Sequence, residues 1–332
     1  MKLAVFEVEE WERPSFERLD SGHDIRFTNE PLTDENAGPY TDFEVISTFI
    51  WSELDRKTLS RFRNLRHIAT RSTGYDHIDT AYCAERGISV SNVPTYGDNT
   101  VAEHVFGLLL AISHNLVDAV ERTRRGDFSQ QGLRGFDLKG KTIGVLGTGS
   151  IGRYVIDIAK GFHMEVLAFD LHPREDLARR IGFKYVSLEE ALRKSDVITL
   201  HIPAIPETYH FLSDREFAMM KEGVVIINTA RGILIDIQAL LRAITSGKVA
   251  AVGLDVLPEE PTIREEAELL RSIAQKKPLD VLLAGHILLR LRNVLITPHS
   301  AFNTKEAVQR ILDTTIENIA AFEKGEARNK VA

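Results

Sequence analysis

Cysteine is nearly absent from the chain, with Cys83 the only one in 332 residues. One cysteine excludes an internal disulfide and any zinc site built from cysteines. The chain also has no lysine- or arginine-rich block, no run of 18 apolar residues and a formal net charge of −7. Neither a nucleic acid nor a membrane is therefore expected as a partner. These absences predict a soluble, cytoplasmic protein that acts on small diffusible molecules.

The length and the alternation of apolar segments predict two α/β domains, because 332 residues exceed the usual size of one hydrophobic core. In the first hundred residues we expect helices at 54–62 and 79–85 and strands at 2–7, 24–27, 43–50, 67–71 and 88–91. From residue 142 onward the alternation is regular, with strands expected at 142–146, 165–169, 196–200, 224–228, 249–254 and 294–296. This pattern is typical of a doubly wound parallel sheet.

Two long amphipathic helices are also expected. Apolar residues from Val101 to Val120 recur at helical spacing until Gly126, which predicts a single long helix between the domains. Apolar residues also share one face of the segment 304–324, which ends at Gly325, a residue typical of helix ends.

A glycine-rich segment, Lys141-Thr-Ile-Gly-Val-Leu-Gly-Thr-Gly-Ser-Ile-Gly152, combines a short apolar strand, a turn and a helix start. Gly147 would allow the tight turn, Gly149 the approach of backbone N–H groups to a pyrophosphate, and Gly152 close helix packing. The bare pattern is weak evidence, but the next apolar strand ends in Asp170, where a ribose-binding carboxylate belongs. The segment therefore predicts NAD as the cofactor, although His172 and Arg174 nearby keep NADP open.

The position of this glycine turn in the middle of the chain predicts that one domain is inserted into the other. We expect a Rossmann domain at 99–299 and a smaller, flavodoxin-like α/β substrate domain made of 1–98 and 300–332. The helix at 304–324 would then return to the N-terminal part.

Polar residues follow four of the expected strands, at the strand ends where open α/β sheets bind ligands: His201, Arg231, Asp255 and His299. The planar guanidinium of Arg231 could clamp a carboxylate and polarise an adjacent carbonyl. His299 could supply a proton at neutral pH, and a carboxylate beside it would favour its charged form. Glu259 and Glu260 are candidates for that carboxylate. The set predicts hydride transfer to a carbonyl.

Eight segments together resemble one family, the D-isomer-specific 2-hydroxyacid dehydrogenases, and in particular its D-lactate dehydrogenase branch. The resemblance covers nearly the whole chain. Besides the glycine turn, the segments are Arg71-Ser-Thr-Gly-Tyr-Asp-His-Ile-Asp79, Val93-Pro-Thr-Tyr96, Val101-Ala-Glu-His104, His201-Ile-Pro203, Asn228-Thr-Ala-Arg-Gly232, Gly253-Leu-Asp255 and Thr297-Pro-His299.

The resemblance implies that Arg231, Glu260 and His299 form the catalytic triad, with Glu259 solvated. It implies that Ser72, Thr73 and Gly74 offer backbone N–H groups to the substrate carboxylate and that Tyr96 lines the pocket, although a packing role for Tyr96 is equally open. On the cofactor side it points, beyond the three glycines, to Ser150, Ile151, Asp170, Ile202, Pro203, Thr208, Thr229, Ala230 and Asp255. Asp255 would contact the nicotinamide amide. A homodimer through the helix at 101–120 is also implied.

We therefore expect an NAD-dependent oxidoreductase that interconverts a small 2-oxo acid and its D-2-hydroxy acid, with pyruvate and D-lactate as the first choice. Alternatives are hydroxypyruvate or glyoxylate reductase, phosphoglycerate dehydrogenase and phosphite dehydrogenase. A regulatory protein that senses NAD(H) is an alternative of another class. No metal site is expected. The segment 261–293, with helices expected at 265–273 and 279–291, could cap the site and restrict it to small acids.

Overall fold

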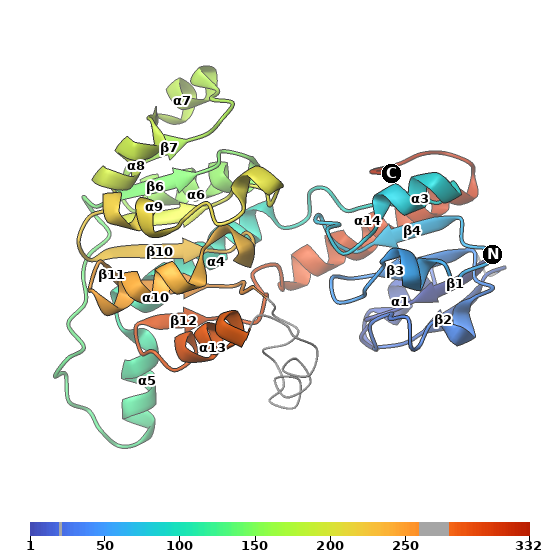
Figure 1. Ribbon diagram of the computed structural model, residues 1–332, viewed down its shortest axis with the longest axis horizontal. Coiled ribbons are helices and arrows are strands. Elements are labelled where there is room, and N and C mark those ends of the chain that lie inside the picture. The colour runs from blue at the N-terminus through green and yellow to red at the C-terminus, as the bar shows by residue number, and fades with distance from the viewer. Residues whose placement is uncertain (20–21, 259–278) are drawn as a thin grey trace. The chain divides into compact units, whose positions relative to one another are not determined.

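The structure is a computed structural model that describes residues 1–19, 22–258 and 279–332. These residues form two compact units (Figure 1): unit 1 contains Met1–Tyr96 and Asn303–Ala332, and unit 2 contains Gly97–Phe302. The boundaries expected at 98/99 and 299/300 lie two and three residues from these. Each unit is built on one parallel sheet with helices packed against it, so the predicted α/β class is confirmed.

Unit 1 is built on a five-stranded sheet in which all strands are parallel, in the order β2-β1-β3-β4-β5. This order is the flavodoxin-like one. The central strands β3 and β4 are buried at every position, as strands covered on both faces should be. The strands are β1 Lys2–Val5, β2 Asp24–Phe27, β3 Val45–Thr48, β4 His67–Thr70 and β5 Ser89–Ser91.

The helices of unit 1 are short except for the last one. They are α1 Arg13–Phe16, α2 Arg56–Leu59, α3 Thr80–Arg86 and α14 Lys305–Glu323, with a 3-10 turn at Gly38–Tyr40. Helix α14 packs on β4 and α1, and the side-chain amide of Asn318 donates to the carbonyl of Asn92 at 2.9 Å. The segment 303–332 therefore completes the first domain, as the red helix beside the blue strands in Figure 1 shows.

Unit 2 is built on a seven-stranded parallel sheet in the order β12-β11-β10-β9-β6-β7-β8. The chain starts at β6 and turns back at β9, so β6 and β9 flank the point where the strand order reverses, which is where dinucleotides bind in Rossmann domains. The strands are β6 Thr142–Leu146, β7 Glu165–Phe169, β8 Lys184–Tyr185, β9 Val197–Leu200, β10 Val224–Asn228, β11 Val249–Leu254 and β12 Val294–Ile296.

Helices cover both faces of this sheet, and a separate apolar cluster lies under each set. One face carries α4 Asp98–Ser113, α6 Ser150–Gly161 and α7 Glu175–Ile181. The other carries α8 Leu188–Lys194, α9 Asp214–Met219, α10 Ile237–Thr245 and α13 Leu279–Leu288. The 3-10 turns are η2 Pro206–Thr208 and η3 Gly232–Leu234.

The single helix expected between Val101 and Val120 is wrong, because the chain bends by 62° between α4 and α5, Leu116–Arg124. Asn115 adopts the left-handed conformation (φ 48°), which asparagine tolerates better than most residues. The carbonyl of Ser113 accepts the N–H of Phe136 at 2.9 Å, so this carbonyl is satisfied outside the helix. Among the described residues no single helix is long and apolar enough to span a membrane.

Candidate functional site

At two of the three glycines in the turn between β6 and α6, only glycine fits. Gly147 has φ +98°, and a Cβ there would lie 2.5 Å from the carbonyl oxygen of His201 at the end of β9. A Cβ on Gly152 would lie 2.1 Å from the carbonyl oxygen of Gly147. These two positions therefore bring the turn, β9 and α6 into direct backbone contact.

The third glycine, Gly149, faces open space, since nothing lies within 4 Å of a Cβ built there. Gly149 is the N-cap of α6, which begins at Ser150 and continues with Ile151. Because glycine has no side chain, it does not cap the first N–H groups of the helix. Uncapped N–H groups at a helix N-terminus attract anions. The arrangement fits the pyrophosphate of a dinucleotide.

Asp170, directly after β7, lies against this turn. Its carboxylate accepts the backbone N–H of Thr148 at 2.7 Å and the N–H of His172 at 2.9 Å. Burial raises the pKa of Asp170, but the N–H groups of His172 and Thr148 outweigh burial, so its pKa lies below the ordinary value. The sheet edge thus holds a charged carboxylate where the sequence predicts one for the ribose.

The segment after β9 contains three predicted cofactor residues, Ile202, Pro203 and Thr208. The hydroxyl of Thr208 donates to the carbonyl of Pro203 at 2.7 Å and accepts the N–H of Ile205 at 2.9 Å. Thr208 is buried, so its hydroxyl shapes the loop that carries Ile202 and Pro203 along the same edge.

The loop after β10 is held by Asn228, whose side chain is 1% exposed. Its amide donates to the carbonyl of Arg231 at 2.9 Å and its oxygen accepts the N–H of Ala230 at 3.0 Å. Thr229, between them, has a buried hydroxyl without a partner among the described residues. An orphaned buried hydroxyl at a predicted cofactor position fits a bound ligand.

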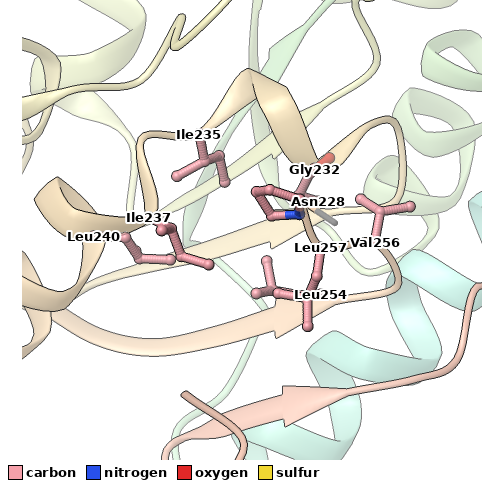
Figure 2. A pocket seen from close by; sticks show the side chains of 9 residues that line it. Asn228, Gly232, Ile235, Ile237, Leu240, Leu254, Val256 and Leu257 are labelled. Atoms are coloured by element: carbon pink, nitrogen blue, oxygen red, sulfur yellow. The ribbon is translucent and has the colours of Figure 1, made fainter. Parts of the chain in front are cut away.

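Gly232 brings Arg231 against the end of β11, because a Cβ there would lie 2.2 Å from the carbonyl carbon of Leu257 and 2.4 Å from the nitrogen of Pro258. Beneath this contact lies an apolar cavity of about 10 Å³, room for a single water. It is lined by Asn228, Gly232, Ile235, Ile237, Leu240, Leu254, Val256, Leu257 and Pro258 (Figure 2). The cavity is too small for a substrate and belongs to the packing under the loop.

The turn that carries His299 is organised by Asp255, which is 1% exposed. The carboxylate of Asp255 accepts the N–H groups of Ser300 at 2.9 Å and Ala301 at 2.8 Å, and its backbone carbonyl accepts the N–H of His299 at 3.0 Å. His299 is half-buried and left-handed, with φ 52°. Asp255 therefore fixes a backbone conformation that histidine adopts at a cost.

In unit 1, the predicted substrate segment Ser72–Gly74 follows β4. The hydroxyl of Ser72 donates to the carbonyl of Gly74 at 2.6 Å, and that of Thr73 donates to the carbonyl of Val93 at 2.7 Å. The buried guanidinium of Arg71 donates to the carbonyls of Phe6 and Glu7, each at 2.7 Å. The segment is thus tied to the chain after β5, and Arg71 before it is tied to the chain after β1.

Tyr96, the last residue of the first stretch of unit 1, is half-buried, and its carbonyl accepts Nε of Arg310 at 2.6 Å. Glu260 and most of the expected cap, residues 261–278, lie outside the described residues.

The structure thus brings Arg231, Asp255 and His299 to the carboxyl ends of three adjacent strands, β10, β11 and β12. Two residues of this edge were not assigned a site role from the sequence, Asn228 and His104. Both lie in segments that carry the family resemblance, which was the available signal. Among the described residues, no cluster of His, Cys, Asp or Glu could hold a metal ion.

Comparison with known proteins agrees with this geometry. The family model "D-isomer specific 2-hydroxyacid dehydrogenase, NAD binding domain" matches residues 106–301. The D-lactate dehydrogenase of Escherichia coli (strain K12) is 37% identical over 98% of both chains. The chain belongs to this family. It is an NAD-dependent oxidoreductase, and the predictions of family, enzyme class and cofactor are confirmed.

Two further members of the family show its range. The crystal structure of D-lactate dehydrogenase from Aquifex aeolicus, complexed with NAD and lactic acid, is 35% identical with a TM-score of 0.84, over 98% of this chain and 96% of that one. The glyoxylate reductase of Thermococcus litoralis is 31% identical over 98% of this chain and 95% of the relative. The family therefore includes enzymes named for different 2-oxo and 2-hydroxy acids.

Proposed function

We propose that this 2-hydroxyacid dehydrogenase interconverts pyruvate and D-lactate. The observation that carries the proposal is that Arg231, Asp255 and His299 follow three adjacent strands, on the edge of the sheet that also carries the glycine turn. Similarity to D-lactate dehydrogenases over nearly the whole chain supports the substrate.

In this proposal the guanidinium of Arg231 binds the 2-oxo acid and polarises its carbonyl, since a planar fork matches a carboxylate better than an ammonium does. The imidazole of His299 donates a proton to the carbonyl oxygen during reduction and accepts it during oxidation. Bound NADH supplies the hydride. Glu260 would orient the imidazole of His299, as the resemblance implies, and Glu259 would be solvated.

Unit 1 is proposed as the substrate domain. Its segment Ser72–Gly74 would offer backbone N–H groups to the carboxylate of the substrate, and Tyr96 would line the pocket. The fixed hydrogen bonds of Ser72 and Thr73 support this role, because a backbone that is already ordered loses little entropy when it binds.

On the cofactor side, we propose that the glycine turn and the first N–H groups of α6 bind the pyrophosphate and that Asp170 binds the ribose. The remaining cofactor contacts are proposed at Ile202, Pro203, Thr208, Thr229, Ala230 and Asp255. Thr208 would act indirectly, because its hydroxyl is bonded to the carbonyl of Pro203 and so holds the loop in place. The hydroxyl of Thr229, which has no partner in the described part of the chain, supports a direct contact.

The test is a panel of 2-oxo acids with NADH, including pyruvate, hydroxypyruvate, glyoxylate and phenylpyruvate. We expect the highest kcat/KM with pyruvate. The substitution Arg231→Ala should lower kcat/KM by about 10²-fold to 10³-fold, and Arg231→Lys should recover part of the loss. If kcat/KM is higher with glyoxylate than with pyruvate, glyoxylate is the preferred substrate and the proposed reaction class still holds.

A chain that binds NADH tightly but turns over no 2-oxo acid would favour the regulatory alternative. Full activity of Arg231→Ala would contradict the proposed role of the arginine. Phosphoglycerate and phosphite belong in the oxidation panel with NAD, because the corresponding dehydrogenases are the remaining alternatives from the sequence.

We further propose a homodimer and a cytoplasmic location. Helix α5 exposes Leu116, Val117 and Val120 on one face, each more than 40% exposed, and Phe128 after it is 80% exposed. An apolar stripe of this kind is typical of a protein interface. A second copy of the chain is the proposed partner, and the single, buried Cys83 suits a reducing compartment.

A further inference from the structure

A histidine outside the proposed triad lies at the base of the His299 turn. His104 lies on α4, and its Nε2 is 2.9 Å from the hydroxyl oxygen of Thr297, the residue two positions before His299. The side chain of His104 is 24% exposed, so it is reached by solvent and is not a core packing residue.

The direction of these hydrogen bonds follows from the chemistry of the hydroxyl. Thr297 has one hydroxyl hydrogen, and it donates this hydrogen to Oδ1 of Asp255 at 2.5 Å. The hydroxyl oxygen can then only accept from His104, so Nε2 of His104 carries a hydrogen. The three side chains form a directed chain from His104 through Thr297 to Asp255. Nε2 of His104 is also 3.5 Å from Oδ1 of Asp255.

This series of hydrogen bonds ends at Asp255, the residue that holds the His299 turn. Asp255 accepts the N–H groups of Ser300 and Ala301 with its two carboxylate oxygens, and its carbonyl accepts the N–H of His299. The carbonyl of Thr297 also accepts the N–H of His299, at 2.9 Å. The backbone N–H of His299 is thus bonded to Thr297 and Asp255, the two residues that the hydrogen bonds from His104 connect.

We propose that His104 is a positioning residue for His299, acting through Thr297 and Asp255. This inference rests on the proposed function, because it assumes that His299 transfers the proton. The imidazole of His104 fixes the rotamer of Thr297, and Thr297 fixes the carboxylate that holds the left-handed turn. Without this chain the imidazole of His299 samples several positions, and proton transfer requires hydrogen-bond distance.

The experiment uses the whole chain of 332 residues and two pairs of matched variants. Thr297→Val removes the hydroxyl with little change of shape, whereas Thr297→Ser keeps it. His104→Leu removes the N–H donor, whereas His104→Gln keeps an N–H donor on a side chain of similar reach. Glu103→Ala, an exposed position next to His104 on α4, is the control for changes to the helix itself.

We expect Thr297→Val and His104→Leu to lower kcat by about 10-fold to 100-fold, the range for groups that orient a functional side chain, with KM for NADH changed less than about threefold. Thr297→Ser and His104→Gln should each recover most of the loss. The kcat of the double variant, His104→Leu with Thr297→Val, should lie within about threefold of that of the slower single variant. Either substitution alone already breaks the hydrogen-bond connection, so the second adds little.

The outcomes separate this inference from the proposed function. A wild-type protein that reduces no 2-oxo acid overturns the proposed function, and with it the role assigned here. An active wild type in which His104→Leu keeps its kcat, or in which the two losses multiply, overturns the positioning role alone. Thermal unfolding of each variant shows whether it is folded, and if Thr297→Val does not fold, the His104 pair decides.

Discussion

The hydroxyl of Thr148, inside the glycine turn, donates to the carboxylate of Asp170 at 2.8 Å, and the backbone N–H of Thr148 donates to the same oxygen at 2.7 Å. The hydroxyl oxygen also lies 2.8 Å from the hydroxyl of Tyr185 on β8. The ends of β6, β7 and β8 are therefore joined at one point. These hydrogen bonds fix the position of the Asp170 carboxylate and favour its charged form.

The substitution Asp170→Asn should weaken the preference for NADH over NADPH, because it removes the charge that repels a 2′-phosphate while keeping the shape. We expect the ratio of kcat/KM for NADPH to that for NADH to rise at least about tenfold, since 1.4 kcal/mol corresponds to a factor of ten. Steady-state kinetics with both cofactors measures it. Asp157→Asn on α6 is the control, because it removes the same charge from an exposed side chain. Equal effects of the two substitutions would contradict a local role for Asp170.

The substitution Gly232→Ala should disable the enzyme, because the new methyl group would overlap the backbone of Leu257 and Pro258. Neither backbone can yield like a flexible side chain, so the loop with Arg231 must move. We expect kcat/KM to fall by about 100-fold or more, the effect of an ångström-scale misplacement at a reacting centre. Gly107→Ala on α4 is the control: nothing lies within 4 Å of a Cβ there, and alanine should stabilise the helix by about 0.5–1 kcal/mol. Normal activity of Gly232→Ala would show that the loop can absorb the methyl group.

Periodicity and turn residues predicted the Rossmann sheet well, because its strands are buried apolar runs that end at glycine or polar residues. All six expected strands of unit 2 agree with the structure within one residue. Strand β8, Lys184–Tyr185, was not predicted, since two residues with one charged side chain carry no periodic signal. The break after α4 was also missed, because apolar spacing continues across His114 and Asn115 although the backbone turns there.

The candidate site could be predicted only as a set of residues that follow strands. The sequence places Arg231 and His299 after β10 and β12, but nothing in it shows that the side chain of Asn228 holds the arginine loop. The contact between His104 and Thr297 spans 193 positions, so it depends on how α4 packs against the sheet. Such contacts are a property of the tertiary fold and leave no local pattern.

Replacing Val117 and Val120 of α5 by glutamate should convert a homodimer into a monomer, because two charges would lie in the apolar stripe proposed as the interface. We expect the wild type to sediment at twice the chain mass of 37.3 kDa and the double variant at that mass. Leu289→Glu, which changes an exposed leucine elsewhere in unit 2, should leave the wild-type mass unchanged. A wild type that sediments as a monomer, or a double variant that remains dimeric, would rule out this interface.

His67 is a buried histidine that begins β4, at the opposite end of the strand from the segment Ser72–Gly74. It lies on β4 with its ring stacked on Phe322 of α14, the ring centroids 4.5 Å apart. Its two nitrogens lie 2.8 Å from the hydroxyl of Ser89 and 3.1 Å from that of Ser91. Burial lowers the pKa of His67 to about 4, against a slight opposing effect of Ser89. The folded protein therefore keeps this imidazole neutral.

This depressed pKa predicts that the free energy of unfolding decreases as the pH is lowered from about 6.5 to about 4. The unfolded chain binds a proton at His67 below a pH of about 6.5, whereas the folded chain does so only below about 4. The contribution of His67 to stability is thus complete above pH 6.5 and declines by about 3 kcal/mol as the pH falls to 4. Urea unfolding at several pH values should show a smaller decline for His67→Asn, which cannot take up the proton, than for the wild type. Carboxylates titrate in the same range in both proteins, so only the difference between them reports His67. Parallel declines would show that this histidine is not the group that couples pH to the packing of α14.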